Sequence, residues 1–272
     1  MSDGVRSWLL PGLPLVFLVL LFGYPVAEFL SVAFTDPAGP FAPFLHLVSE
    51  SVYRIVLGRT ITNALFVVVV VVLLAFPLAL TIAHGPRVVS RTLLFVVAVS
   101  FWTSFVVKSY TWIIVLGNRG PIVELANLLG LDSPRILFTS LAAVIGMAHI
   151  LVPFAVLVLV PSLLRIDRRL LLAAHGLGAS RLQIFRTVIL PLSAPGLSAA
   201  ALLSFVLSIG YYITPALLGT PREMMIAQLI VQQIEELLEW RLAAALSLVL
   251  LTVTVVLSTL YRKASAKAGG EA

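Results

Sequence analysis

Six long apolar stretches, separated by short polar segments, constrain this chain more than any other feature of its sequence. Each is long enough for a helix to cross a hydrocarbon core of about 30 Å, at about 1.5 Å per residue. Hydrophobic residues make up 60% of the 272 residues and charged residues 11%, against about 25% charged residues in a soluble domain. The sequence therefore predicts an all-α polytopic membrane protein, a single domain over residues 1–272 with six transmembrane helices at about 8–34, 61–84, 93–116, 136–163, 196–218 and 242–261.

The charged residues predict how these spans are oriented. Six spans place both termini on one side of the membrane, and the positive-inside rule identifies that side. Most acidic residues fall in the other set of loops. Because the basic residues lie in short loops and at the termini, the formal charge of +6 indicates orientation and not nucleic-acid binding. We expect both termini to be cytoplasmic, together with Arg6, Arg87, Arg91, Arg165, Arg168, Arg169, Arg181, Arg186, Arg262, Lys263 and Lys267.

Catalytic motifs are absent from the sequence. It contains no Gly-x-Ser-x-Gly, no His-Glu-x-x-His and no Gly-x-x-x-x-Gly-Lys-Ser/Thr, so hydrolase, metalloprotease and P-loop ATPase chemistry have no visible machinery. Without cysteine there is no thiolate metal site. His149 is the histidine well inside an expected span, and we expect it to be hydrogen-bonded within the bundle, not to bind a metal. The chain is therefore expected to be no enzyme and to hold no metal or cofactor.

Two ionisable residues fall inside expected spans, where burying a charge costs about 2.5–3.5 kcal/mol on insertion scales. Glu28 lies near the outer end of the first span, and we expect its carboxylate to reach the interface. Lys108 lies about 22 Å from the inner end of the third span, in an unusually polar stretch that also holds Trp102 and Ser104. Lining of a translocation pathway and helix–helix packing both explain these three residues.

The fifth expected span carries a second polar group at the same depth. Tyr211, Tyr212 and Thr214 lie between Gly210 and Pro215. A glycine and a proline in a membrane helix favour a local bend, and a bend exposes backbone groups that a polar cavity satisfies. Small and hydroxylated residues also hold membrane helices together. A polar cavity beside a bent helix and plain packing therefore both remain open for this stretch.

Between Leu164 and Pro195 runs the long segment that is not built for lipid. Asp167 can cap a short helix that runs towards His175 and ends at Gly176 and Gly178. Ser180 with Gln183 is a capping-box pattern, which predicts the start of a second short helix. That helix has Leu182, Phe185 and Val188/Ile189 on one side and Arg181 and Arg186 elsewhere. The segment is therefore interpreted as a cytoplasmic docking surface, residues 164–195.

The same segment resembles the EAA loop of the permease subunits of type I ABC importers, whose consensus is Glu-Ala-Ala, three residues, Gly, then nine residues and Ile-x-Leu-Pro. Ala173, Ala174, Gly178 and Pro191 keep that spacing, and Leu172 stands at the glutamate position. Outside the loop, the stretches 101–112, 146–153 and 210–219 are similar to the spermidine/putrescine-type branch. Docking residues implied by the resemblance are Leu172, Ala173, Ala174, Gly178, Ala179, Ser180, Phe185 and Pro191.

The resemblance also implies the partners and the location. A type I ABC importer permease pairs with a second permease or with a copy of itself, in the bacterial inner membrane. Two cytoplasmic ATPase subunits bind ATP and Mg²⁺ and receive the loop, and a periplasmic or extracellular binding protein delivers the solute. The solute implied by the branch is a polyamine or another small solute. On this basis Trp102, Ser104, Lys108, Tyr211, Tyr212 and Thr214 are the candidates for the translocation pathway.

Two other classes of protein were weighed against the importer. A stand-alone secondary transporter would need ionisable residues near the midplane and a duplicated half, and the sequence has neither. An integral membrane scaffold that transports nothing would explain the apolar spans but not the glycine-bearing segment at 164–195. An ATPase subunit that co-purifies with the chain would separate the importer from both.

Overall fold

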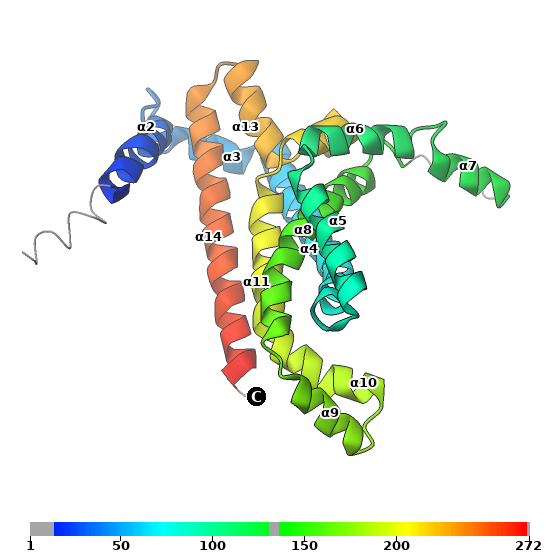
Figure 1. The fold of residues 1–272 in the computed structure, drawn as a ribbon. Coiled ribbons are helices and arrows are strands. Elements are labelled where there is room, and N and C mark those ends of the chain that lie inside the picture. The colour runs from blue at the N-terminus through cyan, green and yellow to red at the C-terminus, as the bar shows by residue number, and fades with distance from the viewer. Residues whose placement is uncertain (1–13, 131–135, 271–272) are drawn as a thin grey trace, which may run out of the picture. The chain divides into compact units, whose positions relative to one another are not determined.

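The computed structural model describes residues 14–130 and 136–270, and most of that length is helical (Figure 1). The first part of the first expected span, residues 8–13, lies outside the described residues. The chain divides into two compact units, Met1–Arg54 with Leu229–Val253 and Ile55–Gln228 with Thr254–Ala272. Three helices, α4 (Ser51–His84), α13 (Ile226–Glu235) and α14 (Trp240–Gly270), continue from one unit into the other.

The first unit contains an apolar helical segment whose most apolar part is uncovered. Pro14–Phe34 has none of its most apolar window buried; it includes a π turn η1 (Val19–Gly23), α2 (Tyr24–Ser31) and a 3₁₀ turn η2 (Val32–Phe34). Glu28 is exposed on α2, as are the apolar residues before it. After α2 the chain folds back through α3 (Ala42–Ser49), where Phe44 packs against Phe34 with ring centroids 5.4 Å apart.

The second unit has its core around α8 (Ser140–Leu164). Val67 and Val71 of α4 and Met147, Leu151 and Leu159 of α8 are fully or almost fully buried in one apolar cluster. Small residues let neighbouring helices approach α8 closely, as is common in membrane bundles. A Cβ added at Gly196 of α11 (Leu190–Ile209) would collide with the Ser162 side chain. One at Gly146 would meet Leu218 of α12 (Ile213–Leu218) and the Thr214 methyl group, 2.8 Å away.

The number of continuous spans differs from the prediction. In the described residues five helices are long and apolar enough to cross a membrane: Pro14–Phe34, Ser51–His84, Ser140–Leu164, Arg181–Ile209 and Trp240–Ser265. The expected third span, 93–116, is not one helix. It is divided between α5 (Arg87–Trp102) and α6 (Phe105–Leu116). The segment Arg87–Trp102 is bent by 100° from the segment Phe105–Leu128, which also includes α7 (Pro121–Leu128). Six spans result if this bent pair is one of them.

The break between α5 and α6 lies at Thr103 and Ser104. Thr103 and Ser104 are extended, with ψ of 132° and 133°, and the Thr103 hydroxyl donates to the Val99 carbonyl at 2.8 Å. The same hydroxyl bond to the carbonyl four residues back occurs inside continuous helices, as at Thr62 and Thr81 of α4, so it does not by itself cause the break. The Ser104 carbonyl then accepts from the Lys108 amide at 3.1 Å and begins α6. The depth of Lys108 counted along a straight helix was therefore wrong.

The fifth span is longer than predicted at one end and broken at the other. The second short helix does not stand alone, because α10 (Arg181–Ile184), a π turn η3 (Phe185–Ile189) and α11 form one helix from Arg181 to Ile209. In the π turn the Leu190 amide bonds to the Phe185 carbonyl, five residues back. This wider turn relieves the clash that the Pro191 ring makes in a regular α-helix. At the other end the helix stops at Gly210 and restarts as α12, so the predicted bend is confirmed.

Candidate functional site

The first of two helices in segment 164–195 begins where Asp167 predicts. The Arg169 amide donates to Asp167 Oδ1 at 2.9 Å, and this cap begins α9 (Arg168–Gly176). In Figure 1, α9 and α10 project beyond the ends of α8 and α11. The cap satisfies one of the helix's free N-terminal amides, so a short helix forms outside the bundle.

Gly178 is needed for the turn that ends α9. Its φ is +83°, a region that side chains with a Cβ rarely adopt. The Gly178 amide donates to the His175 carbonyl at 3.0 Å and the Ala179 amide to the Ala174 carbonyl at 3.1 Å, the two bonds of a Schellman motif. The spacing between Ala174 and Gly178 in the motif is therefore the spacing of a helix C-terminus.

The capping box that starts the second helix is complete. The Gln183 amide donates to Ser180 Oγ at 3.3 Å, and the Ser180 amide donates to Gln183 Oε1 at 2.7 Å. Both bonds of the predicted box are therefore present. With the Schellman motif two residues earlier, they fix the angle between α9 and α10 by local backbone geometry alone.

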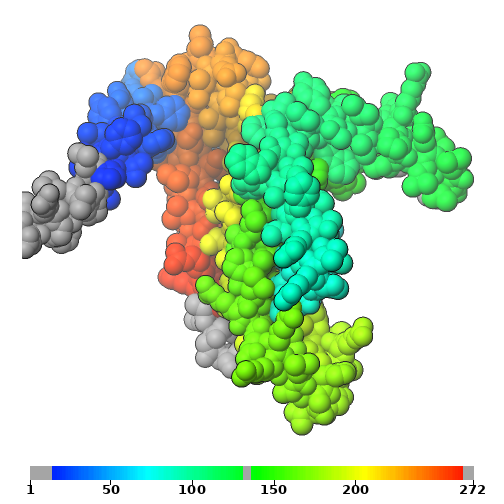
Figure 2. Space-filling model, viewed as in Figure 1, coloured from blue at the N-terminus to red at the C-terminus, as the bar shows by residue number. Residues whose placement is uncertain are grey.

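The surface of this helix pair is apolar and uncovered. Leu172 is 70% exposed and Leu177 is 89% exposed, and Figure 2 shows the pair standing out from the rest of the second unit. Of the other predicted docking residues, Ala174 and Ala179 are half-buried, and Ala173, Gly178, Ser180 and Pro191 are exposed.

Phe185 differs from the other predicted docking residues. Its ring lies edge-on to Phe76 of α4, with centroids 6.0 Å apart, and it packs on the apolar cluster of the second unit. Ile189 and Leu171 pack on the same cluster. The helix pair thus has an outer face that is uncovered and an inner face that is joined to the bundle.

The predicted pathway residues do not form one group. Lys108 is 6% exposed and Thr214 is fully buried, whereas Trp102 is 85% exposed and Ser104 is also exposed. Tyr211 is half-buried against the apolar cluster. Tyr212 is exposed beside it. Within the described residues Lys108 makes no ion pair and no side-chain hydrogen bond, so it is a covered cation without a counter-ion there.

Two polar contacts connect the neighbourhood of Lys108 to other helices. Ser109 Oγ and Thr214 Oγ1 lie 3.0 Å apart between α6 and α12. The Trp112 indole donates to His149 Nδ1 of α8 at 3.1 Å, which confirms that His149 is hydrogen-bonded within the bundle. Sequence reasoning did not single out Ser109, although a hydroxyl beside a lysine in an apolar stretch is a signal that could have found it.

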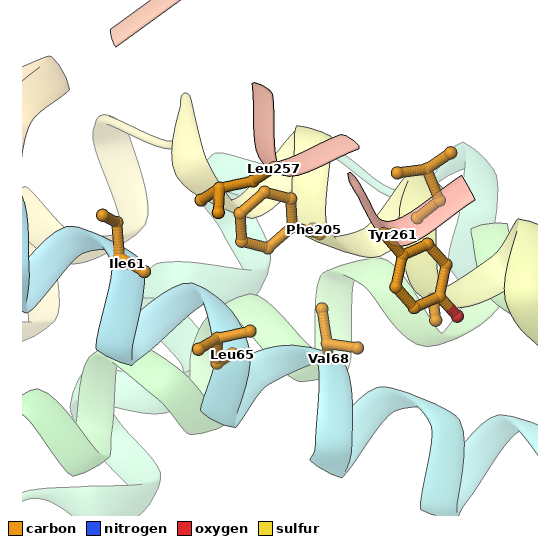
Figure 3. Close-up of a pocket in the computed structure, with 8 residues that line it drawn as sticks. Ile61, Leu65, Val68, Phe205, Leu257 and Tyr261 are labelled. Carbon is orange, nitrogen blue, oxygen red and sulfur yellow. The ribbon is translucent and has the colours of Figure 1, made fainter. Parts of the chain in front are cut away.

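A cavity of about 240 Å³ lies elsewhere in the second unit, between α4, α11 and α14 (Figure 3). Apolar side chains line it almost completely. None of the predicted pathway residues is among them: Ile61, Leu65, Val68, Ala201, Leu202, Phe205, Leu257 and Tyr261. This lining suits hydrocarbon and offers no recognition of a polar solute.

The fold and the family match place the chain in one class of protein, the membrane-spanning subunits of ABC importers. The family described as "Binding-protein-dependent transport system inner membrane component" matches residues 60–267. The chain belongs to this family. Its similar relatives are transport permease subunits and not enzymes.

Curated relatives include polyamine permeases. The chain is 35% identical over 218 residues to the spermidine/putrescine transport system permease protein PotB of Escherichia coli K12, covering 79% of each chain. It is 30% identical to the protein of the same name from Haemophilus influenzae, over 78% of this chain and 75% of that one. A probable sulfate transport system permease protein of Chlorella vulgaris is 30% identical over 55% of this chain and 56% of the other.

Solved structures share the fold at low identity. A chain of a bacterial ABC transporter involved in import of the acidic polysaccharide alginate superposes with a TM-score of 0.79 and 20% identity, covering 98% of both chains. A chain of the MetNI methionine ABC transporter gives a TM-score of 0.62 with 17% identity, over 84% of this chain and 98% of that one. The fold is therefore that of an ABC importer permease.

Proposed function

We propose that this chain is a permease subunit of a polyamine ABC importer, with α9 and α10 as the coupling element that docks on a cytoplasmic ATPase. The observation that carries the coupling role is the exposed apolar surface of Leu172 and Leu177 on a helix pair fixed by its own caps. Relatives named as spermidine/putrescine permeases support the solute class.

The chemistry of docking follows from the exposed side chains. Leu172 stands where the family consensus has a glutamate, so this position offers apolar burial and no carboxylate. An exposed leucine that becomes fully covered contributes about 1.5–3 kcal/mol. Shape and apolar area, flanked by Arg168, Arg169 and Arg181, then hold the pair in a groove of the ATPase. ATP and Mg²⁺ are bound in that partner, and this chain supplies neither a catalytic group nor a cofactor site.

The remaining partners follow from the class. A second permease, either a copy of this chain or a different one, completes the pathway across the inner membrane, with both termini of this chain in the cytoplasm. A solved bacterial alginate ABC transporter is in complex with an alginate pentasaccharide-bound periplasmic protein, and a similar external protein delivers the polyamine here. In this assignment that protein selects the solute, because Lys108 has the wrong charge sign to bind a polycation.

Gly178 gives the test of the coupling role. Gly178 and Gly176 both have open space where a Cβ would go, but only Gly178 has a positive φ. A β-branched residue is a true outlier there. Gly178→Val should therefore abolish solute-dependent ATP hydrolysis and leave membrane insertion intact. Gly176→Val should retain most of the solute-dependent ATP hydrolysis. Unchanged coupling in Gly178→Val, measured in proteoliposomes with the partner subunits, would refute the role of the helix pair.

The solute is tested on the partner binding protein. Its thermal unfolding should shift upward with spermidine or putrescine, since a ligand at 100 times its Kd stabilises by about 2.7 kcal/mol. Amino acids and sulfate serve as the comparison. A shift with sulfate alone would assign the chain to oxyanion import.

A further inference from the structure

Residues that flank the coupling element on either side contact α4 at two points that no chain connection requires. Phe185 packs edge-on against Phe76, with ring centroids 6.0 Å apart. At the end of α4, the His84 side chain lies beside the backbone of Ile166, the residue before the Asp167 cap. His84 Nδ1 is buried and has no hydrogen-bond partner within the described residues.

These two contacts lie on the same terminal part of α4. Phe76 and His84 are eight residues apart, about 12 Å along the helix. Between them Pro77 removes one backbone hydrogen bond of the helix. The Pro77 carbonyl accepts from the Thr81 hydroxyl at 2.8 Å. The segment from Phe76 to His84 therefore contacts residues that flank the coupling element at each of its two ends. It begins beside Pro77, where α4 can bend.

Two other helices, α8 and α11, are connected to the coupling element through the chain itself. The coupling element continues into α11 through the π turn, and it follows α8 after a turn at Arg165–Asp167. α4 has no such connection, because the next segment in sequence is α5. A displacement of α9 and α10 therefore reaches α4 only through side-chain and backbone contacts. Ile166, which is buried, and Leu171 pack on the same apolar cluster as Ile82 and Ala83.

We propose that Phe76 and His84 are positioning residues that transmit the movement of the coupling element to α4, through Phe185 and the Ile166 backbone. This inference rests on the proposed coupling role of α9 and α10. It adds a route into the bundle that requires no carboxylate in the loop. Because both receiving residues are on α4 and not on the docking surface, coupling and ATPase docking can be separated by substitution.

The experiment uses the complete transporter in proteoliposomes, with three readouts: ATPase retained on purification, ATP hydrolysis, and solute taken up per ATP hydrolysed. Phe76→Ala and His84→Ala should retain the ATPase as the unaltered chain does. Uptake per ATP should fall on the order of fivefold, as expected for loss of an aromatic pair. His84→Gln, which keeps a side-chain N–H donor, should restore most of the uptake. Phe66→Ala is the matched control, since Phe66 is a phenylalanine of the same helix that is 60% exposed.

A double-mutant cycle tests the contact itself. If Phe76 and Phe185 act through each other, Phe76→Leu and Phe185→Leu should give non-additive losses of uptake per ATP. Wild-type uptake per ATP in Phe76→Ala and His84→Ala would overturn the proposal. So would loss of the ATPase on purification of these variants, because it would make both residues part of docking or folding. If no ATPase co-purifies with the unaltered chain, the proposed function fails instead.

Discussion

Ser109 of α6 and Thr214 of α12 share a hydrogen bond of 3.0 Å, and both side chains are fully buried. The bond joins residues 105 positions apart and fixes the helix that follows the break at Thr103 to the helix that follows the break at Gly210. The two interrupted segments of the bundle are thus held to each other by a polar contact beside Lys108.

Removing the Ser109 hydroxyl should lower the stability more than removing the Thr214 hydroxyl. Ser109 Oγ also donates to the Phe105 carbonyl at 2.9 Å, so Thr214→Val leaves it satisfied and should cost about 0.5–1.5 kcal/mol. Ser109→Ala leaves the buried Thr214 hydroxyl without this partner and should cost about 1–3 kcal/mol. Free energies of unfolding in mixed micelles measure the difference. Equal costs, or a larger cost for Thr214→Val, would show that the pair is not bonded as described.

Gly146 should not tolerate a methyl group. A Cβ there would meet the Leu218 side chain and the Thr214 methyl group, and overpacking of this kind costs about 1–3 kcal/mol. Gly58, in α4, has open space at the same position, so Gly58→Ala should stabilise by up to about 1 kcal/mol through helix propensity. The temperature of thermal inactivation of the purified protein should be lower for Gly146→Ala than for the unaltered chain. For Gly58→Ala it should be equal or higher.

Thr60 should matter more than the neighbouring ion pair. Its buried hydroxyl accepts from the Ile226 amide at 2.9 Å, and Thr60→Val leaves that amide unpaired at a cost of about 1–3 kcal/mol. Arg59 and Glu223 approach only to 4.0 Å at a partly exposed site, where ion pairs contribute about 0–1 kcal/mol.

The control for Thr60 is Thr62, whose hydroxyl bonds to the Gly58 carbonyl of its own helix and is exposed. Thr62→Val should change the free energy of unfolding by less than about 0.5 kcal/mol, and Thr60→Ser should retain most of the stability. A Thr60→Val variant as stable as Thr62→Val would contradict the bond to Ile226.

The caps of the coupling element should control its local stability. Asp167→Ala and Ser180→Ala each remove a side-chain acceptor from a helix N-terminus, at about 1 kcal/mol. Amide hydrogen exchange in α9 should accelerate on the order of fivefold in Asp167→Ala, since about 1 kcal/mol corresponds to that factor. Asp167→Asn, which keeps an acceptor oxygen, is the matched control. Exchange that is equally slow in Asp167→Ala would show that the cap does not hold the helix.

Local patterns were predictable from the sequence, and long-range pairings were not. Asp167, Ser180 and Gln183 occupy the positions that helix caps require, so the element at 164–195 could be located without a structure. Gly210 and Pro215 likewise indicated the bend between α11 and α12. Nothing local pairs Ser109 with Thr214 or Trp112 with His149, because each contact depends on how distant helices pack.

The errors have physical causes of the same kind. Hydropathy alone makes 93–116 one span, and it does not register the two extended residues, Thr103 and Ser104, that separate α5 from α6. The second helix of segment 164–195 was expected to be short, yet the π turn before Pro191 lets it continue into α11. Phe185 stays a predicted docking residue, and its contact with Phe76 could not be anticipated because it depends on where α4 lies.

The π turn at Phe185–Ile189 also sets the rotation of Arg181–Ile184 relative to α11 within one continuous helix. Each residue advances an α-helix by about 100°, so removing one residue from this turn would swing Arg181–Ile184 about a quarter of a revolution around its axis. Phe185 would then leave Phe76 while every cap and every apolar span stayed intact. A one-residue deletion here should therefore yield a protein that is inserted and folded but has lost the contact between Phe185 and Phe76.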